Sequence, residues 1–425
     1  MDKKKFLIIE STVFIEVNSE VVLFYDSIDG KKVLSKNKEI YEFFKEIDKT
    51  THMYALDDHA LNSKSFIELI KSLEKNLMGR IITNLKTPPV QFYPMPKPNV
   101  LTDEDKGNNN ESDKCLQYLT ELSIYSDTFH PSAPSIFSYA YKQTLCHIQD
   151  ISIKENTNIG SFMDLLLKIT ELKTLNRLNI LGGDLLSILE TKKAKDSIAA
   201  LSQNIEVNIH INYFAFPKID IIKRIHDEIK SLKFKYCIAN HLKTGDIGII
   251  KELCLLDYVD FVCLCENAND VLLYEELFID SDASFQLIPI YNGKNSDFFS
   301  ENVFLEFEDI MGVNINQVEV QKNIALNTNK FGKLFILPNA TVFSDINSKK
   351  LGNLNDVYFT EIVYNEINNG DNWFKTRLKV NPCNTCVFCA ICPPISNYEH
   401  AFQMYNLCNI NMKQLHISKI NNYSG

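Results

Sequence analysis

The residues of this chain that could do chemistry gather in one short segment. Five of its eleven cysteines fall between Cys383 and Cys408, four of them in the run Pro-Cys-Asn-Thr-Cys-Val-Phe-Cys-Ala-Ile-Cys-Pro (382–393). Cys383, Cys386 and Cys392 form a C-x2-C-x5-C pattern. Four thiolates complete the ligand set of a tetrahedral zinc ion or of a four-iron cluster. The spacing therefore predicts a metal site and leaves iron and zinc open.

The other six cysteines show no metal-binding pattern. Each lies in an apolar stretch, where a thiol behaves as a small buried hydrophobic group, and we assign them no function. They are Cys115, Cys146, Cys237, Cys254, Cys263 and Cys265.

The opening residues and the hydropathy of the chain bear on its location. Residues 1–10 hold lysines followed by only four apolar residues, too few for the core of a signal peptide. No later run approaches the roughly eighteen apolar residues that cross a bilayer. We therefore expect a soluble, cytoplasmic protein with no membrane partner. Thiols stay reduced in that compartment, so we expect metal ligation rather than disulfides.

Composition limits the classes of partner. The chain has 425 residues, of which 45% are hydrophobic and 23% charged, as in ordinary globular proteins. Its length predicts two or three domains. The net charge of -10 is spread without a basic block, which excludes a nucleic-acid footprint and favours a peptide or protein partner.

The first 86 residues read as a small α+β unit. Three β-rich runs, with a turn at Ser27–Gly30, predict an antiparallel meander, and two helical patterns follow it. We expect strands at 12–17, 20–26 and 31–35, and helices at 40–47 and 65–77. This order predicts a winged-helix-like unit over residues 1–86. A proline-rich and then polar stretch follows, which we interpret as a linker over residues 87–117.

Strand and helix patterns alternate after the linker. Apolar, β-branched strands separated by helices such as 161–174 and 219–232 predict a parallel sheet buried on both faces. The expected strands are 121–125, 177–181, 205–213, 234–239, 258–265 and 285–291. We therefore predict a partial βα barrel over residues 118–300, with any chemistry at the carboxyl ends of its strands.

The alternation stops near residue 302, which predicts a separate small domain over residues 301–425. A hairpin is expected there, with strands at 333–337 and 341–344, ahead of the cysteines. Because a metal bound by distant cysteines joins the segments that carry them, this domain should depend on its metal.

The cysteine pattern, with Pro-Pro-Ile-Ser-Asn-Tyr-Glu (393–399) after it and Asn-Leu-Cys (406–408) closing it, resembles the SPASM domain of pseudo-radical-SAM proteins from Bacteroidetes peptide-maturation operons. The runs Tyr-Asn-Gly-Lys-Asn (291–295) and Asn-Thr-Asn-Lys-Phe-Gly-Lys-Leu (327–334) are also similar to that group. The resemblance covers about residues 121–408 and is most specific in its last third.

A full SPASM domain holds two auxiliary four-iron clusters, and the resemblance implies that only the second is complete here. Its four ligand positions match Cys383, Cys386, Cys392 and Cys408. For the first cluster, Ala340 and Asp345 stand where the family has a glycine and then a cysteine, no cysteine lies between 323 and 335, and Ser396 replaces a further cysteine. The resemblance thus implies one 4Fe-4S cluster, with zinc as the alternative, and gives Cys389 no role.

Radical SAM enzymes carry C-x3-C-x2-C in the loop after the first barrel strand, where three thiolates hold the catalytic cluster. No cysteine stands in the corresponding loop of this chain. With Phe137 matched to the aromatic residue before the third cysteine, the three ligand positions fall on Pro131, Ser135 and Ser138. Proline has no ligating side chain and serine is a poor substitute for a thiolate. We therefore predict no reductive cleavage of SAM.

A short glycine motif ends the second strand of the barrel. Gly182, Gly183 and Asp184 resemble the Gly-Gly-Glu motif that contacts the amino group of SAM, and could be a vestige of it. A strand-to-helix turn capped by Asp184 accounts for the same residues. We do not predict SAM as a cofactor.

The leading hypothesis from these resemblances is an accessory protein of peptide maturation without catalytic residues of its own. It would bind the leader of a precursor peptide, a true radical SAM maturase, or both. The N-terminal unit is similar to maturase elements that take up a leader as an extra strand, although a plain packing domain fits the pattern too. Two alternatives are electron transfer through the remaining cluster and a SAM-independent enzyme on the barrel face. The sequence offers no paired carboxylates, activated nucleophile or phosphate loop for the latter.

Overall fold

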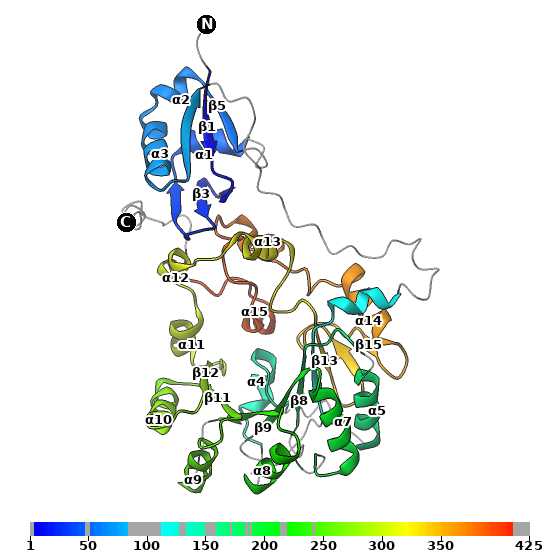
Figure 1. The fold of residues 1–425 in the computed structure, drawn as a ribbon. Coiled ribbons are helices and arrows are strands. Elements are labelled where there is room, and N and C mark those ends of the chain that lie inside the picture. Colours follow the sequence, from blue (N-terminus) through cyan, green and yellow to red (C-terminus); the bar gives the residue numbers. More distant parts are fainter. Residues whose placement is uncertain are drawn as a thin grey trace.

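The computed structural model describes residues 4–46, 52–83, 112–126, 133–148, 159–170, 172–182, 186, 189–212, 219–239, 242 and 244–410. The N-terminal unit lies against one end of a larger α/β body, which is built on a sheet of both parallel and antiparallel strands (Figure 1). No helix in the described part of the chain is both long and apolar enough to span a bilayer.

The N-terminal unit holds two three-stranded antiparallel sheets. The predicted meander is confirmed as β2 (Val13–Asn18), β3 (Val21–Asp26) and β4 (Lys32–Ser35), in that order. A second sheet, with the order β5-β1-β6, was not predicted. It consists of β1 (Lys5–Ile9), β5 (Met53–Leu56) and β6 (Gly79–Thr83). The helices are α1 (Lys38–Lys45), α2 (Asp58–Asn62) and α3 (Lys64–Lys75), of which the first and third match the predicted pair.

Aromatic side chains fill the core of this unit. Phe24 of the meander meets Phe44 of α1 edge to face, with 5.1 Å between ring centroids, and Phe44 meets Tyr54 of β5 at 5.3 Å. Edge-to-face pairs at such distances add to the gain from burial. One face of the meander is therefore closed by the helices and the second sheet of its own unit.

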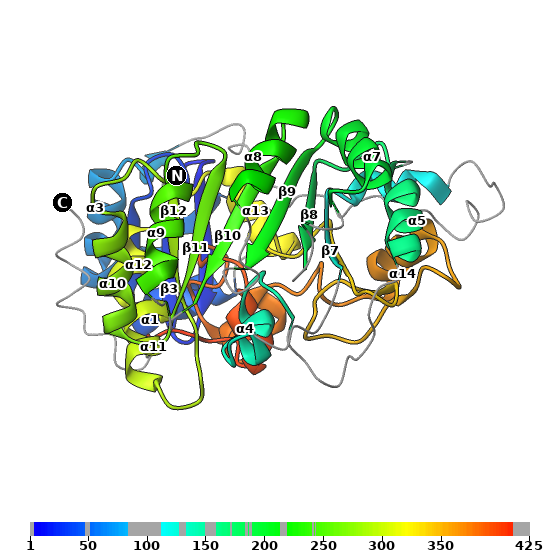
Figure 2. The same ribbon diagram turned by 90° about the horizontal axis from the view of Figure 1, so that it is seen from below.

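The larger body is organised by a nine-stranded sheet. Its order is β12-β11-β10-β9-β8-β7-β13-β14-β15, and Figure 2 shows the strands from β12 to β7 side by side. All six predicted strands are confirmed, and they pair in parallel in chain order. They are β7 (Glu121–Tyr125), β8 (Arg177–Leu181), β9 (Glu206–Asn212), β10 (Lys233–Ile238), β11 (Val259–Cys265) and β12 (Phe285–Pro289).

The two faces of these parallel strands differ in character. One face carries apolar residues such as Leu122 and Ile180, which join a continuous core with the helices. Those helices are α5 (Ile159–Thr170), α7 (Lys192–Ser202), α8 (Ile219–Glu228), α9 (Thr244–Leu253) and α10 (Ala268–Phe278). The other face carries buried polar groups: Asn208 donates to Asn179 at 3.2 Å, and Asn179 donates to Glu121 at 3.0 Å. Alternation along each strand produces both faces.

The predicted hairpin is confirmed and extends the sheet. It consists of β13 (Lys333–Ile336) and β14 (Thr341–Phe343), followed by β15 (Gly352–Asn353). Because β13 pairs in parallel with β7, the hairpin continues the sheet of the preceding residues. The remaining elements are α4 (Phe137–Gln143), α11 (Ser296–Val303), α12 (Phe307–Gly312), α13 (Gln317–Ala325), α14 (Phe359–Asn369), α15 (Asn397–Phe402) and the 3-10 turns η2 (Ser112–Tyr118), η4 (Arg377–Lys379) and η5 (Cys383–Thr385).

Candidate metal centre

The five clustered cysteines surround one cavity of about 670 Å³. The four predicted ligands Cys383, Cys386, Cys392 and Cys408 line it together with Cys389. None of the eleven cysteines, all of which lie in described residues, forms a disulfide. The structure thus places all five of the clustered cysteines around the same cavity.

Tight turns explain how the local sequence gathers these thiols. The amide of Cys386 donates to the carbonyl of Cys383 at 2.9 Å, and the amide of Cys389 donates to that of Cys386 at 3.3 Å. Cys392 donates in turn to Phe388 at 2.8 Å. Successive turns of three or four residues return the chain to the same side, as in a 3-10 helix.

Cys408 reaches the cavity from a different segment. The amide of Leu305, just before α12, donates to the carbonyl of Leu407 at 3.0 Å, and the amide of Asn409 donates back to Leu305 at 3.0 Å. These two backbone bonds fix the segment around Cys408 beside the cysteine loop. The fourth thiol is therefore placed by tertiary contacts and not by local spacing.

Burial makes these thiols weak acids. Burial, with smaller contributions from the neighbouring thiols of Cys383 and Cys408, raises the pKa of Cys386 to about 11 and that of Cys392 to about 12. A soft metal binds the thiolate, so ligation by Cys386 and Cys392 has to displace their protons.

Arg377 supplies positive charge to the cavity. Its Nη1 lies 3.4 Å from Cys383 Sγ and donates to Glu399 Oε1 at 2.9 Å. Its Nε donates to the carbonyl of Pro393 at 2.5 Å, next to Cys392. Although burial raises the pKa of the Cys383 thiol overall, the guanidinium acts in the opposite direction. A buried cation at this position favours the thiolate that a metal would bind.

The distances between side chains and the donor chemistry of the site lead to different expectations for a metal. Within the described residues, no three His, Cys, Asp or Glu side chains are arranged to hold one metal ion. Yet four thiols and a cationic neighbour are a donor set for a soft metal. The chemistry of these residues therefore fits a soft metal.

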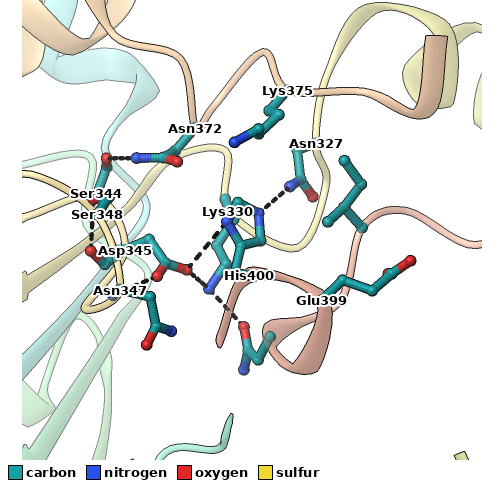
Figure 3. A network of polar contacts seen from close by, with 12 residues as sticks. Asn327, Lys330, Ser344, Asp345, Asn347, Ser348, Asn372, Lys375, Glu399 and His400 are labelled. Carbon is teal, nitrogen blue, oxygen red and sulfur yellow. Dashed lines mark hydrogen bonds and ion pairs between the residues drawn. The ribbon is translucent and has the colours of Figure 1, made fainter. Parts of the chain in front are cut away.

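A polar network lies where the resemblance expects ligands of a first cluster (Figure 3). Asp345, at the position of the missing cysteine, forms a buried ion pair with Lys330, whose ammonium also donates to Asn397 Oδ1 at 2.6 Å. His400 Nδ1 lies 4.0 Å from Asp345 Oδ2, and His400 Nε2 lies 3.3 Å from the side-chain nitrogen of Asn327.

The charges in this network follow from its surroundings. Burial opposes ionisation of Asp345, but Lys330 and His400 beside it lower its pKa overall. Burial lowers the pKa of His400 to about 4, so the imidazole is neutral near pH 7. Ser396, at another position of a missing cysteine, caps α15 by accepting from the amide of Glu399 at 3.2 Å.

The predicted remnants of a SAM site fall only partly within the described residues. Ser135 and Ser138 lie at the start of α4, where the Ser138 hydroxyl donates to the Ser135 carbonyl at 2.7 Å. Gly182 directly follows β8. Pro131, Gly183 and Asp184 lie outside the described residues.

Several residues of this region were missed by sequence reasoning. Arg377 and His400 are isolated charged or titratable residues without a local motif, and Lys330 lies in the run 327–334, for which sequence reasoning predicted no polar contact. Ser19 and Glu20, which also line the cysteine cavity, come from the opposite end of the sequence. The hydropathy pattern holds no signal for contacts of such separation.

No protein-family model and no curated protein matches this chain. Among solved structures, Streptococcus suis SuiB matches with 12% identity and a TM-score of 0.41, over 95% of this chain and 100% of that one. SuiB bound to precursor peptide SuiA matches with 13% identity and a TM-score of 0.38, over 94% and 98%. SuiB bound to S-adenosylmethionine matches with 12% identity and a TM-score of 0.39, over 94% and 97%.

Proposed function

We propose that this chain is an accessory pseudo-radical-SAM protein of ribosomal peptide maturation, with a partial βα barrel and a SPASM-like metal site. It binds the precursor peptide, a radical SAM maturase, or both, and does not cleave SAM itself. The observation that carries this proposal is one complete four-cysteine set lining a cavity, in a chain whose first barrel strand is followed by no cysteine motif.

Cys383, Cys386, Cys392 and Cys408 would hold one 4Fe-4S cluster. Four convergent thiols, the cavity of about 670 Å³ and the guanidinium of Arg377 support this choice. Zinc is the alternative, because it takes the same four thiolates. A bound cluster would supply a cross-link between the cysteine loop and the segment of Cys408, together with a centre that can carry an electron.

This chain lacks the thiolate ligands of the cluster that cleaves SAM. The catalytic cluster of a radical SAM enzyme needs three thiolates after β7, and this loop contains none. The Ser138 hydroxyl, at one of the three positions, bonds to a backbone carbonyl of its own turn. The barrel would therefore act as a scaffold.

The meander offers the leader peptide an edge and not a face. Its inner face packs on α1 and α3, and its outer face packs on the C-terminal segment through Val21, Leu23 and Tyr25. β4 is one of the two edge strands of its sheet, with β2 at the other edge. An extended peptide can pair with such an edge through main-chain hydrogen bonds.

The register of β4 identifies the backbone groups that face this edge. Asp26 donates to the carbonyl of Lys31, so Phe24 and Val33 form the next hydrogen-bonded pair. The N–H groups of Lys32 and Leu34 then point away from β3. Leu34 is therefore the position where a proline removes an outward donor.

The experiment is a calorimetric titration of the leader of a precursor peptide into the full chain, because the isolated N-terminal unit would expose Leu23 and Tyr25. Leu34→Pro should weaken binding by about tenfold or more, since it removes a main-chain donor. Leu34→Val is the matched control for the loss of side-chain volume. If the two variants bind equally, or if the wild type does not bind at micromolar concentration, β4 is not the recognition edge.

A further inference from the structure

The tight turn between β2 and β3 lies at the cysteine cavity. Ser19 and Glu20 form this turn, and both line the cavity although they belong to the N-terminal unit. Their φ angles are 48° and 63°. A two-residue hairpin turn of type I′ requires positive φ at both positions, and contacts outside the turn add to what the hairpin imposes.

Two of those contacts are made with the loop that joins two predicted ligands. The side-chain amide of Asn18 donates to the carbonyl of Asn384 at 3.0 Å, and the Ser19 hydroxyl donates to the carbonyl of Thr385. Asn384 and Thr385 are the two residues between Cys383 and Cys386. The turn therefore binds two of the three peptide groups that link these two cysteines.

Apolar contacts reach the next part of the cysteine loop. Val21 and Leu23 of β3 belong to one buried cluster with Val387, Phe388 and Ile391. These three residues lie between Cys386 and Cys392. The N-terminal unit thus contacts both stretches of chain that connect the first three ligands.

A second attachment of the same unit lies away from the cysteines. Tyr25 Oη bonds to both the carbonyl and the amide of Ile315 at 2.6 Å. The Lys32 ammonium donates to the carbonyls of Met311 and Val313, at 3.0 and 2.6 Å. These partners belong to α12 and the loop after it, so the hydrogen bonds of this attachment go to a segment other than the cysteine loop, although both segments contribute to the same buried cluster.

We propose that Asn18 and Ser19 are positioning residues of the metal site and that an occupied site in turn fixes the β2–β3 turn. The inference rests on the proposed metal site. A metal would hold Cys383 and Cys386 at a set separation and so present the two carbonyls to the turn. By linkage, contacts that favour the bound arrangement strengthen metal binding, and metal binding strengthens those contacts. The site on the C-terminal segment and the peptide-recognition unit are then one coupled structure.

Backbone hydrogen exchange of the full chain, as isolated and after removal of metal with a chelator, tests the coupling. We expect residues 18–22 to lose protection when the metal is removed, while residues 30–33, at the Lys32 attachment, keep theirs. Equal protection of the turn in both forms would overturn the inference and leave the metal site standing. Loss of protection throughout the unit would also overturn it. Absence of iron and zinc from the isolated protein would overturn both proposals.

Variants of the turn test the positioning role. Ser19→Gly removes the hydroxyl but suits the left-handed backbone, so any effect comes from the lost hydrogen bond. We expect the double variant Asn18→Ala/Ser19→Gly to lose its metal to a chelator about tenfold faster than the wild type, which is the lower end of the effect of residues that orient metal ligands. The absorption spectrum of the bound metal should also shift. Asn62→Ala removes a comparable bond to the Asp58 carbonyl, distant from the cysteines, and is the control. Wild-type release rates and spectra in the turn variant would contradict the proposal.

Discussion

Arg377 and Glu399 form a buried, two-pronged ion pair beside the cysteine cavity. Nη1 and Nη2 of the arginine donate to the two carboxylate oxygens at 2.9 and 3.2 Å, and both side chains are at least nine-tenths buried. The pair joins the 3-10 turn ahead of the cysteines to α15. Because Nη1 also lies 3.4 Å from Cys383 Sγ, the pair connects the stability of this region with the charge of the thiols.

Removing the arginine alone should destabilise the protein strongly. Arg377→Met leaves the Glu399 carboxylate buried without its cation, and breaking a buried pair in this way costs about 3 kcal/mol or more. Arg377→Met combined with Glu399→Gln removes both charges, keeps a side-chain oxygen that can accept from the Ser396 amide in the capping box of α15, and should recover most of the loss. Urea unfolding of the metal-loaded proteins measures both values. A double variant as unstable as the single one would show that the pair itself is not the cause.

The Lys330–Asp345 pair should be needed for stability but not for metal binding. Asp345→Asn leaves the buried Lys330 ammonium without its carboxylate, and we expect a loss of about 3 kcal/mol in the free energy of unfolding. Metal content should stay at the wild-type level, because the pair lies outside the cysteine cavity. Asp356→Asn, at an exposed position, is the matched control. A parallel loss of metal in the Asp345 variant would place this network in the metal site.

Glu366 predicts a specific pH dependence of stability. Burial raises the pKa of this carboxyl from 4.5 to about 7 in the folded protein, so the unfolded chain releases its proton first. Folding stability should therefore fall as pH rises from about 4.5 to about 7. Glu366→Gln removes this effect. The free energy of unfolding of this variant, relative to that of the wild type, should therefore increase by about 3 kcal/mol as pH rises from about 4.5 to about 7, which corresponds to the pKa difference.

Denaturant unfolding at pH 4.5 and pH 8 measures this change for Glu366→Gln. Glu361→Gln, at an exposed position of the same helix, is the matched control for removing one carboxylate from α14. A difference between the Glu366 variant and wild type that is the same at both pH values would show that the carboxyl ionises normally in the folded state.

The protein should not cleave SAM. By the resemblance, Ser135 and Ser138 stand where a catalytic cluster would have two of its thiolates, and the whole chain has no cysteine between Cys115 and Cys146. Incubation of the anaerobic protein with SAM and a strong reductant should yield no 5'-deoxyadenosine above a control without protein. Its formation at a rate proportional to protein concentration would refute the pseudo-enzyme assignment.

The sequence predicted the elements whose signal is local. The strand at 121–125 and its parallel neighbours are short apolar runs, and the meander is marked by its turn at Ser27–Gly30. The sheet β5-β1-β6 was missed because β1 pairs only with strands more than forty residues away in the sequence. The same distinction holds for the site. Close spacing revealed the cysteines, whereas the contact of Ser19 with Thr385 joins residues 366 positions apart.

Iron, sulfide and zinc analysis of protein purified without oxygen tests the central claim most directly. The account predicts a brown protein with about four irons and four sulfides per chain, as a single four-iron cluster requires. Cys386→Ala should abolish most of the iron, whereas Cys389→Ala, which changes a thiol of the same cavity, should keep it. A colourless protein with one zinc per chain would contradict the iron assignment, and a protein that holds neither metal would contradict the site itself.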